Sequence, residues 1–261
     1  MDLELQGKVA VVTGAGKGIG LAITQALVKE GVHVVAGSRR RTPELKELDE
    51  RGSVQAIEVD LATTAGPAHL IAAALAHGRL DILVNNVGAV APRLTGFMNV
   101  TDEQWLHCLT LNLMAAIRTT RAALPTMLAA GHGNVVTISS VNAFLPDPAV
   151  IDYSAAKAAL TNFSKALSKE VGAQGIRVNT ISPGPVTTDL WLGDEGVAAT
   201  VARANGGDPA AVAKQTAAQA ETGRFTHPHE IADLVLLLSS DRAGNVTGTD
   251  FVIDGGLTKT L

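Results

Sequence analysis

Short runs of aliphatic and β-branched residues alternate with longer amphipathic stretches along nearly the whole chain. The runs are apolar almost without a break, which is typical of parallel strands that helices cover on both faces. Between the runs, apolar residues recur at helical spacing, as in the stretch from Ile19 to Leu27. The predicted strands are residues 9–13, 32–38, 54–61, 81–86, 133–140, 176–183 and 250–256.

This alternation predicts a Rossmann-type α/β fold, a doubly wound parallel sheet of about seven strands in three α/β/α layers. The strand–helix units use the whole chain, so we expect one domain over residues 1–261. The one irregular region, residues 189–223, begins with Leu190, Trp191 and Leu192. A long, partly helical insertion is typical of a binding segment, so we expect a substrate lid, with burial against a second subunit as the alternative.

Composition excludes several classes of function. A net charge of −4, no basic stripe and 3% aromatic residues argue against nucleic-acid binding. No apolar run reaches the ~20 residues that cross a bilayer, and no signal peptide is evident, so we expect a cytoplasmic protein without membrane contact. The single cysteine, Cys108, excludes an internal disulfide. His227 and His229 have no third ligand nearby, so no metal site is expected.

The first strand–helix connection, TGAGKGIG at residues 13–20, is rich in glycine. Glycines here allow a tight turn and let an anion approach the backbone at the helix N-terminus. A P-loop is excluded because no Gly-Lys-Ser/Thr follows at the required spacing. The connection therefore predicts a dinucleotide-binding loop, whose candidate residues are Gly14, Lys17, Gly18, Ile19 and Gly20.

The end of the second strand, AGSRRR, distinguishes between the two nicotinamide dinucleotides. Folds that prefer NAD usually place an acidic residue there for the ribose 2′-hydroxyl, and this segment has none. Ser38 and Arg39 stand where a 2′-phosphate would bind, and Lys17 adds a second positive charge. NADP(H) is the expected cofactor, with NAD(H) as the alternative. The non-functional explanation is a solvated turn.

The stretch YSAAK places the only tyrosine, Tyr153, four residues before Lys157, so both lie on one face of a helix. A nearby ammonium and an oxidised cofactor favour the phenolate, which lowers the pKa of Tyr153 towards the operating pH. A general acid/base is most effective there. The apolar stripe expected on the same helix is Ala156, Ala159, Leu160, Phe163 and Leu167.

Six elements together resemble the short-chain dehydrogenase/reductase family over nearly the whole chain. They are TGAGKGIG, NNVG, NLMA, ISSV, YSAAK and SPGPVTT, in that order. The resemblance is closest in style to 3-oxoacyl-thioester reductases. It implies an NADP(H)-dependent oxidoreductase that interconverts a carbonyl and a secondary alcohol of a small-molecule substrate by hydride transfer. It also implies a homo-oligomer, a tetramer or a dimer.

The resemblance assigns roles to individual residues. Ser140, thirteen residues before Tyr153, orients the substrate oxygen. Lys157 also binds the nicotinamide ribose, and Asn112 helps to hold a water relay. The remaining implied cofactor contacts are Asp60 and Leu61 at the adenine, Asn86 and Gly88 at the adenosine ribose, and Pro183, Gly184, Val186 and Thr188 at the carboxamide.

Three other functions are compatible with parts of the pattern. An NAD-dependent alcohol or sugar dehydrogenase of the same family differs only in cofactor and substrate. A sugar epimerase or dehydratase uses a similar Tyr-Lys pair, but needs a larger C-terminal domain than the residues after Thr188 provide. A non-catalytic NADP(H)-sensing protein is expected to have lost part of the Ser-Tyr-Lys set, which is intact here.

Overall fold

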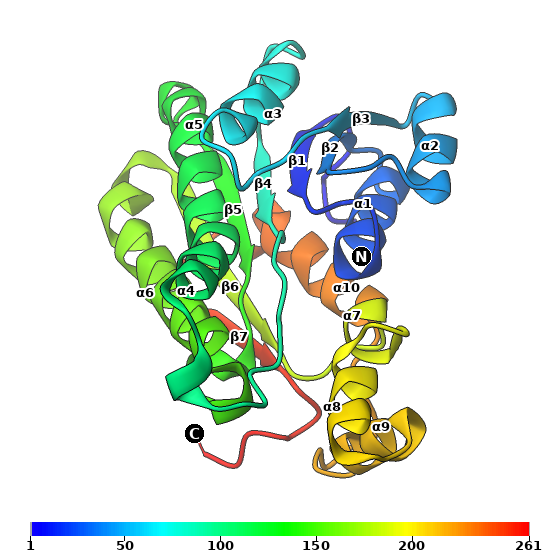
Figure 1. Cartoon of the computed structure of the whole chain (residues 1–261). Helices are drawn as coiled ribbons and strands as arrows, with labels where there is room; N and C mark the ends of the chain where they lie inside the picture. Colours follow the sequence, from blue (N-terminus) through cyan, green and yellow to red (C-terminus); the bar gives the residue numbers. More distant parts are fainter. Residues whose placement is uncertain (1, 261) are drawn as a thin grey trace.

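The computed structural model describes residues 2–260, which contain one seven-stranded sheet between two layers of helices (Figure 1). Every strand pairing is parallel, and the order is β3-β2-β1-β4-β5-β6-β7. This architecture confirms the predicted Rossmann-type fold. The strands are β1 (Val9–Thr13), β2 (His33–Ser38), β3 (Val54–Glu58), β4 (Ile82–Asn85), β5 (Gly133–Ile138), β6 (Ile176–Pro183) and β7 (Asp250–Ile253).

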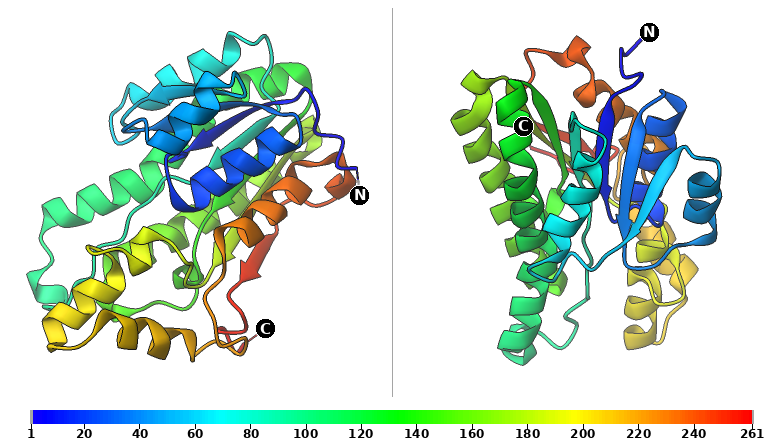
Figure 2. Two further views of the ribbon diagram at one scale, coloured as in Figure 1. Left: turned by 90° about the vertical axis from the view of Figure 1, so that its right-hand side faces the viewer. Right: turned by 90° about the horizontal axis from the view of Figure 1, so that it is seen from above.

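Helices cover both faces of the sheet (Figure 2). One layer contains α1, α2 and α10, and the other contains α3, α5 and α6. A π-helical turn, Thr110–Met114, joins α4 to α5. The helices are α1 (Gly18–Lys29), α2 (Pro43–Glu50), α3 (Gly66–Leu75), α4 (Asp102–Leu109), α5 (Ala115–Ala130), α6 (Ile151–Val171), α7 (Asp189–Leu192), α8 (Val197–Asn205), α9 (Pro209–Ala217) and α10 (Pro228–Ser239).

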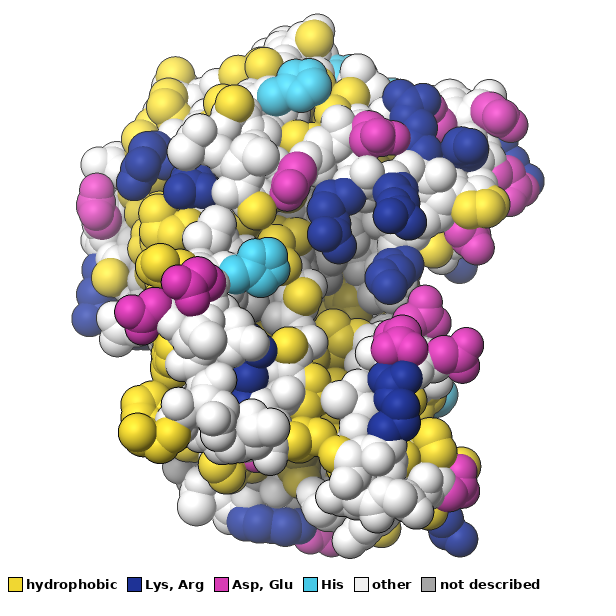
Figure 3. All heavy atoms as spheres, viewed as in Figure 1, with side chains coloured by type: hydrophobic (Ala, Val, Ile, Leu, Met, Phe, Trp, Pro, Cys, Tyr) yellow, Lys and Arg dark blue, Asp and Glu magenta, His cyan; other side chains and the backbone are white. Residues whose placement is uncertain are grey.

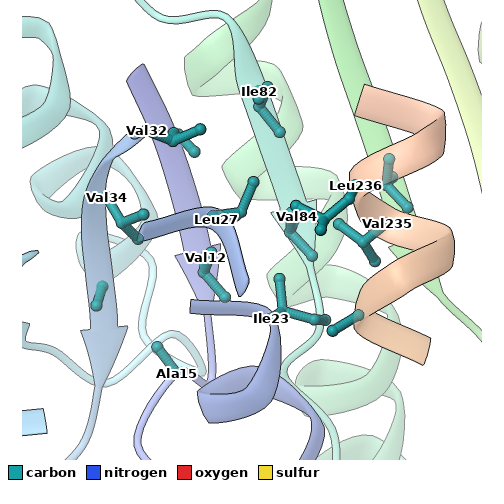
Figure 4. Packing of buried hydrophobic residues seen from close by; sticks show 14 of the residues in the cluster. Val12, Ala15, Ile23, Leu27, Val32, Val34, Ile82, Val84, Val235 and Leu236 are labelled. Atoms are coloured by element: carbon teal, nitrogen blue, oxygen red, sulfur yellow. The ribbon is translucent and has the colours of Figure 1, made fainter. Parts of the chain in front are cut away.

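The two hydrophobic layers explain why the strands are apolar without a break. In β1, Ala10 and Val12 pack towards α1 and α10, whereas Val11 between them packs towards the opposite layer. Side chains alternate across a strand, so a strand buried on both faces, such as β1, has no position that faces solvent and favours a charged residue. Figure 4 shows the first layer, in which strand residues such as Val84 meet Ile23 of α1 and Val235 of α10.

Several strands end earlier than predicted. The apolar runs suggested ends at residues 61, 86 and 140, but β3, β4 and β5 end at Glu58, Asn85 and Ile138. After β3 the apolar run continues because Val59 and Leu61 are buried loop residues, whereas the residues directly after β4 and β5 are polar: Asn86, Ser139 and Ser140. The residues beyond the ladder turn over the carboxyl edge of the sheet, where doubly wound folds bind their ligands.

The predicted stripe on α6 is wrong at one position. Ala156, Leu160 and Leu167 are buried and Phe163 is half-buried, but Ala159 is exposed. The buried face is rotated towards Lys157 and three serines, Ser154, Ser164 and Ser168. Serines are small enough to let α6 lie close to the sheet. Because they are polar, a pattern of apolar residues at helical spacing does not indicate that these positions are buried.

The irregular region forms α7, α8 and α9, which lie together beside the carboxyl ends of the strands (Figures 1 and 2). The Trp191 ring meets Phe225 edge-to-face, with 5.3 Å between the ring centroids. Leu190 and Leu192 remain 40% and 49% exposed. The function of this region as a lid, and the organisation of the chain as one domain, stay predictions.

Within residues 2–260, no helix is both long and apolar enough to span a membrane. The same residues contain no group of three metal-binding side chains. His227 directly precedes α10, which begins at Pro228, and its backbone N–H donates to the Glu230 carboxylate at 2.7 Å.

Candidate active site

A cleft of about 1220 Å³ opens at the carboxyl ends of the strands, between the sheet and the α7–α9 region. Figure 3 shows this hollow with apolar side chains inside it and Lys and Arg side chains at its upper rim. Of the residues proposed from the sequence for catalysis or cofactor binding, all except Asn112 line the cleft. The fold therefore brings together residues from Gly14 to Thr188.

The glycine loop leaves the N-terminus of α1 ready for an anion. Within the described residues, neither a side-chain cap at Lys17 nor an acidic residue in the first turn occupies the N–H groups there. Gly14 and Gly18 adopt positive φ values of 67° and 55°. A Cβ at Gly20 would lie 2.2 Å from the Gly14 carbonyl oxygen. The loop thus fits a dinucleotide pyrophosphate.

Two polar side chains hold this loop against the end of β4. The Asn86 amide donates to the carbonyls of Thr13 (2.9 Å) and Gly14 (3.2 Å). The Thr13 hydroxyl accepts from the backbone N–H groups of Asn86 (2.8 Å) and Val87 (3.0 Å). The Asn86 side chain is therefore committed to loop geometry. The sequence reasoning missed the structural role of Thr13, although its place as the first residue of the loop was a signal.

The three arginines after β2 have different environments. Arg39 and Arg40 are exposed and line the cleft, whereas Arg41 donates to the Ala56 carbonyl at 2.8 Å and pairs with Asp49 at 3.3 Å. Within the sequence RRR, two guanidinium groups are therefore available to an anion and one is structural. The sequence reasoning did not include Arg40, although it belongs to the same basic run.

Two further polar groups border this anion site. The Ser38 hydroxyl donates to the Arg40 carbonyl at 2.7 Å, which holds the turn. The Lys17 ammonium, on the glycine loop, lies 4.0 Å from the Asp189 carboxylate, and both side chains are largely exposed. An exposed pair of this kind is weak, so Lys17 remains available to a phosphate.

Ser140, Tyr153 and Lys157 meet where β5 ends and α6 begins. Tyr153 is half-buried in the first turn of α6, and the Lys157 ammonium, one turn later, lies 5.6 Å from the centroid of its ring. Lys157 is 3% exposed and donates to the Ile138 carbonyl at 2.8 Å. The Ser140 hydroxyl contacts Asn142, accepting from its backbone N–H at 3.2 Å.

Burial shifts the pKa of both titratable groups. Burial raises the pKa of Tyr153 to about 12, and a hydrogen bond with Ser140 opposes this rise. Burial lowers the pKa of Lys157 to about 8. In the chain without cofactor the direction for Tyr153 is a rise, because burial removes the hydration of the phenolate. The lowering expected from the sequence, which includes the effect of an oxidised cofactor, stays a prediction. In the chain alone, Tyr153 is a neutral phenol, the form that donates a proton.

Asn112 is buried in the π-helical turn, and its amide is bonded to backbone. Its Oδ1 accepts from the Ala89 N–H at 3.0 Å, and its Nδ2 donates to the carbonyls of Ala89 (2.9 Å) and Cys108 (3.0 Å). These bonds hold the loop after β4, where a Cβ at Gly88 would lie 2.9 Å from the Asn112 Oδ1. A role for Asn112 in a water relay stays a prediction.

Replacing Lys157 with methionine is expected to stabilise the fold at neutral pH by up to about 3 kcal/mol. The lowered pKa of Lys157 means that the folded chain holds its charged form at a cost. Loss of the hydrogen bond to Ile138 offsets about 1 kcal/mol of the gain. Urea denaturation of both proteins over a series of pH values measures the difference.

The number of protons that Lys157 binds in the folded and in the unfolded chain determines whether stability rises or falls with pH. Between pH 8 and 10.5, unfolded Lys157 is protonated and folded Lys157 is not, so wild-type stability from this group rises with pH. The advantage of the methionine variant is therefore complete below about pH 8 and disappears towards pH 10.5. A variant that is less stable than wild type by the same amount at every pH would contradict this account.

Comparison with known proteins agrees with the fold and indicates an oxidoreductase. The family profile described as enoyl-(acyl carrier protein) reductase matches residues 14–258. The 3-oxoacyl-(acyl carrier protein) reductase of Escherichia coli is 34% identical over 261 residues, covering 98% of this chain and 99% of that protein. An uncharacterized oxidoreductase of Bacillus subtilis is 33% identical over 271 residues and all of both chains.

Solved structures resemble the chain over its full length. The L-sorbose reductase of Gluconobacter frateurii, solved with NADPH and L-sorbose, is 37% identical, has a TM-score of 0.92 and matches 100% of both chains. The aldohexose dehydrogenase of Thermoplasma acidophilum has a TM-score of 0.88 at 26% identity, covering 100% of this chain and 98% of that one. The chain belongs to the short-chain dehydrogenase/reductase family, NAD(P)-dependent oxidoreductases that interconvert carbonyl and alcohol groups.

Proposed function

We propose that this protein reduces a ketone to a secondary alcohol with NADPH, and that Tyr153 is the proton donor. One observation carries the proposal: a phenol that is neutral at physiological pH stands in the cleft beside Ser140 and one helical turn from Lys157. Carbonyl reduction builds negative charge on oxygen, and that oxygen must receive a proton. A neutral phenol supports the reductive direction.

Each catalytic side chain has a separate task in this scheme. The Ser140 and Tyr153 hydroxyls donate hydrogen bonds to the substrate oxygen and orient it. NADPH, when bound, supplies the hydride to the carbonyl carbon. The Tyr153 proton moves to the oxygen as the charge develops, and the Lys157 ammonium stabilises the phenolate that remains. The products are the alcohol, NADP⁺ and a Tyr153 phenolate, which regains a proton from solvent.

In this proposal, residues along the carboxyl edge of the sheet would hold the cofactor. Gly14, Gly18, Ile19 and Gly20, at the N-terminus of α1, line the cleft and would hold the pyrophosphate. Asp60 and Leu61, which follow β3, would contact the adenine, and Asn86 and Gly88 the adenosine ribose. Pro183, Gly184, Val186 and Thr188, after β6, would hold the carboxamide, with the Val186 backbone N–H as a donor.

A preference for NADPH over NADH is part of the proposal. Arg39 and Arg40 are exposed beside Ser38, and Lys17 lies on the adjacent loop, so several positive charges surround the position of a 2′-phosphate. The solved L-sorbose reductase with NADPH supports this preference, since it matches the whole chain at 37% identity.

The substrate class follows from the cleft wall beyond Tyr153. Leu94, Leu145, Leu190 and Trp191 line it, so we propose a ketone that carries an apolar arm, such as a 3-oxoacyl thioester. The E. coli 3-oxoacyl-(acyl carrier protein) reductase among the relatives supports this class. A keto-sugar is the second candidate, favoured by Asn142 in the same wall and by the L-sorbose reductase.

NADPH consumption against a matched panel tests the function. The panel contains acetoacetyl-coenzyme A, L-sorbose and a simple cyclic ketone, each assayed with NADPH and with NADH. We expect the thioester to give the largest kcat/KM, with NADPH as the preferred cofactor. Faster turnover of sorbose would select the second candidate. NADPH binding without turnover of any ketone would favour a sensing protein. Assembly into a dimer or tetramer, and a cytoplasmic location, stay predictions.

A further inference from the structure

A buried ion pair outside the Ser-Tyr-Lys set joins two segments that line the cleft next to Tyr153. We propose that Arg93 and Asp152 are positioning residues: the pair fixes the first turn of α6 and balances charge beside Tyr153. This inference rests on the proposed function of Tyr153 as the proton donor. Neither residue lines the cleft, and both act through Tyr153.

Both carboxylate oxygens of Asp152 accept hydrogen bonds. One Asp152 oxygen accepts from two guanidinium nitrogens of Arg93, at 3.0 Å and 2.6 Å. The other Asp152 oxygen accepts from the Tyr153 backbone N–H at 2.9 Å. The carboxylate therefore has the Arg93 guanidinium on one side and the Tyr153 backbone on the other. Asp152 is 1% exposed and the Arg93 side chain 14% exposed, so water screens this pair little.

The pair connects two segments that are far apart in sequence. Arg93 belongs to the loop after β4, and its backbone N–H also donates to the Ala149 carbonyl at 2.6 Å. That loop contributes Leu94 to the lining of the cleft, and the adjoining segment contributes Ala149 and Tyr153. A displacement of the loop would therefore move the residue that must meet the substrate oxygen.

Net stability alone does not account for this ion pair. A buried pair adds little compared with well-packed apolar residues of the same volume. Removal of one partner, by contrast, leaves a single buried charge next to the backbone of Tyr153. The Asp152 carboxylate alone would oppose formation of the phenolate, and the Arg93 guanidinium alone would favour it. When both residues are present, their opposite effects on the formation of the Tyr153 phenolate offset each other.

Other charged and titratable groups face the same tyrosine. The Lys157 ammonium lies on α6, and the Asp147 carboxylate lines the cleft from the segment before α6. Cys108 of α4 is buried, and burial followed by the Asp152 charge raises its pKa to about 11, so its thiol is neutral. Lys157 and Asp147 are unchanged in every variant below. Cys108 responds to the charges of Arg93 and Asp152 itself, so differences between variants report these two residues, either directly or through Cys108.

Ultraviolet titration of the sole tyrosine tests the proposal without requiring turnover. The proteins are wild type, Arg93→Gln, Asp152→Asn and the double variant, each with and without saturating NADP⁺. We expect the pKa of Tyr153 to rise by roughly one unit in Arg93→Gln and to fall by roughly one unit in Asp152→Asn. The double variant is expected to return close to wild type. The pH profile of alcohol oxidation should shift in the same directions.

Arg79→Gln is the matched control. Arg79 pairs with Asp81, which is also 1% exposed, but that pair lies at the opposite end of β4 from the cleft. This variant is expected to lose stability without any shift in the Tyr153 titration. Damage to the fold alone therefore does not reproduce the expected pattern.

Three outcomes would overturn the proposal: shifts of the same sign in both single variants, no shift in either, or an equal shift in Arg79→Gln. If Arg93→Gln does not fold, the other two variants still distinguish the outcomes. The pKa of Tyr153 is expected to fall in Asp152→Asn and to stay close to the wild-type value in the uncharged double variant. Failure of the proposed function shows differently, because Tyr153→Phe would then keep its turnover while the titration results stand.

Discussion

Tyr153→Phe is expected to lower kcat for ketone reduction by about 10²- to 10⁴-fold, the usual contribution of a positioned general acid. The substitution removes only the hydroxyl, so the half-buried ring keeps its packing in the first turn of α6. Affinity for NADPH and the melting temperature should change little. Steady-state kinetics, together with a fluorescence titration of NADPH, separate the lost chemical step from lost binding.

Two neighbouring serines provide a matched control for this result. Ser140→Ala should also lower kcat strongly, because its hydroxyl stands beside Tyr153 at the end of β5. The Ser139 hydroxyl instead bonds to Thr161 of α6 at 2.6 Å, so Ser139→Ala should affect stability more than turnover. Activity of Tyr153→Phe at the wild-type rate would rule out Tyr153 as the proton donor.

The double variant Arg39→Ala/Arg40→Ala is expected to reduce the preference for NADPH over NADH by about 10- to 100-fold. Each charge-assisted hydrogen bond to a phosphate contributes about 1.5–3 kcal/mol, and exposure of these side chains places the effect towards the lower end. The loss should appear in KM for NADPH, while KM for NADH changes little. The ratio of kcat/KM with the two cofactors measures it.

Arg41→Ala is the control for that experiment, because it removes the same kind of side chain from the next position. Its guanidinium bonds to the Ala56 carbonyl and Asp49, so we expect lower stability and an unchanged cofactor ratio. A loss of NADPH preference in Arg41→Ala, but not in the double variant, would reverse the assignment of the three arginines.

Local patterns were sufficient for the fold. The central strands of a doubly wound sheet are buried on both faces, so their apolar character is visible in a short window of sequence. The glycine loop is equally local, because positive φ values at Gly14 and Gly18 and the close approach at Gly20 require glycine. The exact ends of the strands were harder to predict, since β3 and β5 end before the runs that predicted them.

The sequence predicted which catalytic residues lie in the candidate site, but not the environment of Tyr153. The sequence placed Tyr153 and Lys157 on one helical face, and the structure brings both into the cleft. It did not show that burial raises the pKa of Tyr153, because hydration depends on segments from elsewhere in the chain that pack around the phenol. The exposed position of Ala159 was missed for a similar reason: serines occupy the face that contacts the sheet.

The sequence by itself determined the elements, the glycine loop and the Ser-Tyr-Lys set, since each depends on residues within a few positions or on a fixed order of motifs. Tertiary structure alone decided which arginines face the cleft and what surrounds Tyr153. Arg93 and Asp152 are 59 residues apart, and nothing local to either one predicts the pair. Such contacts depend on how loops meet at the sheet edge, and burial then makes them strong by excluding water.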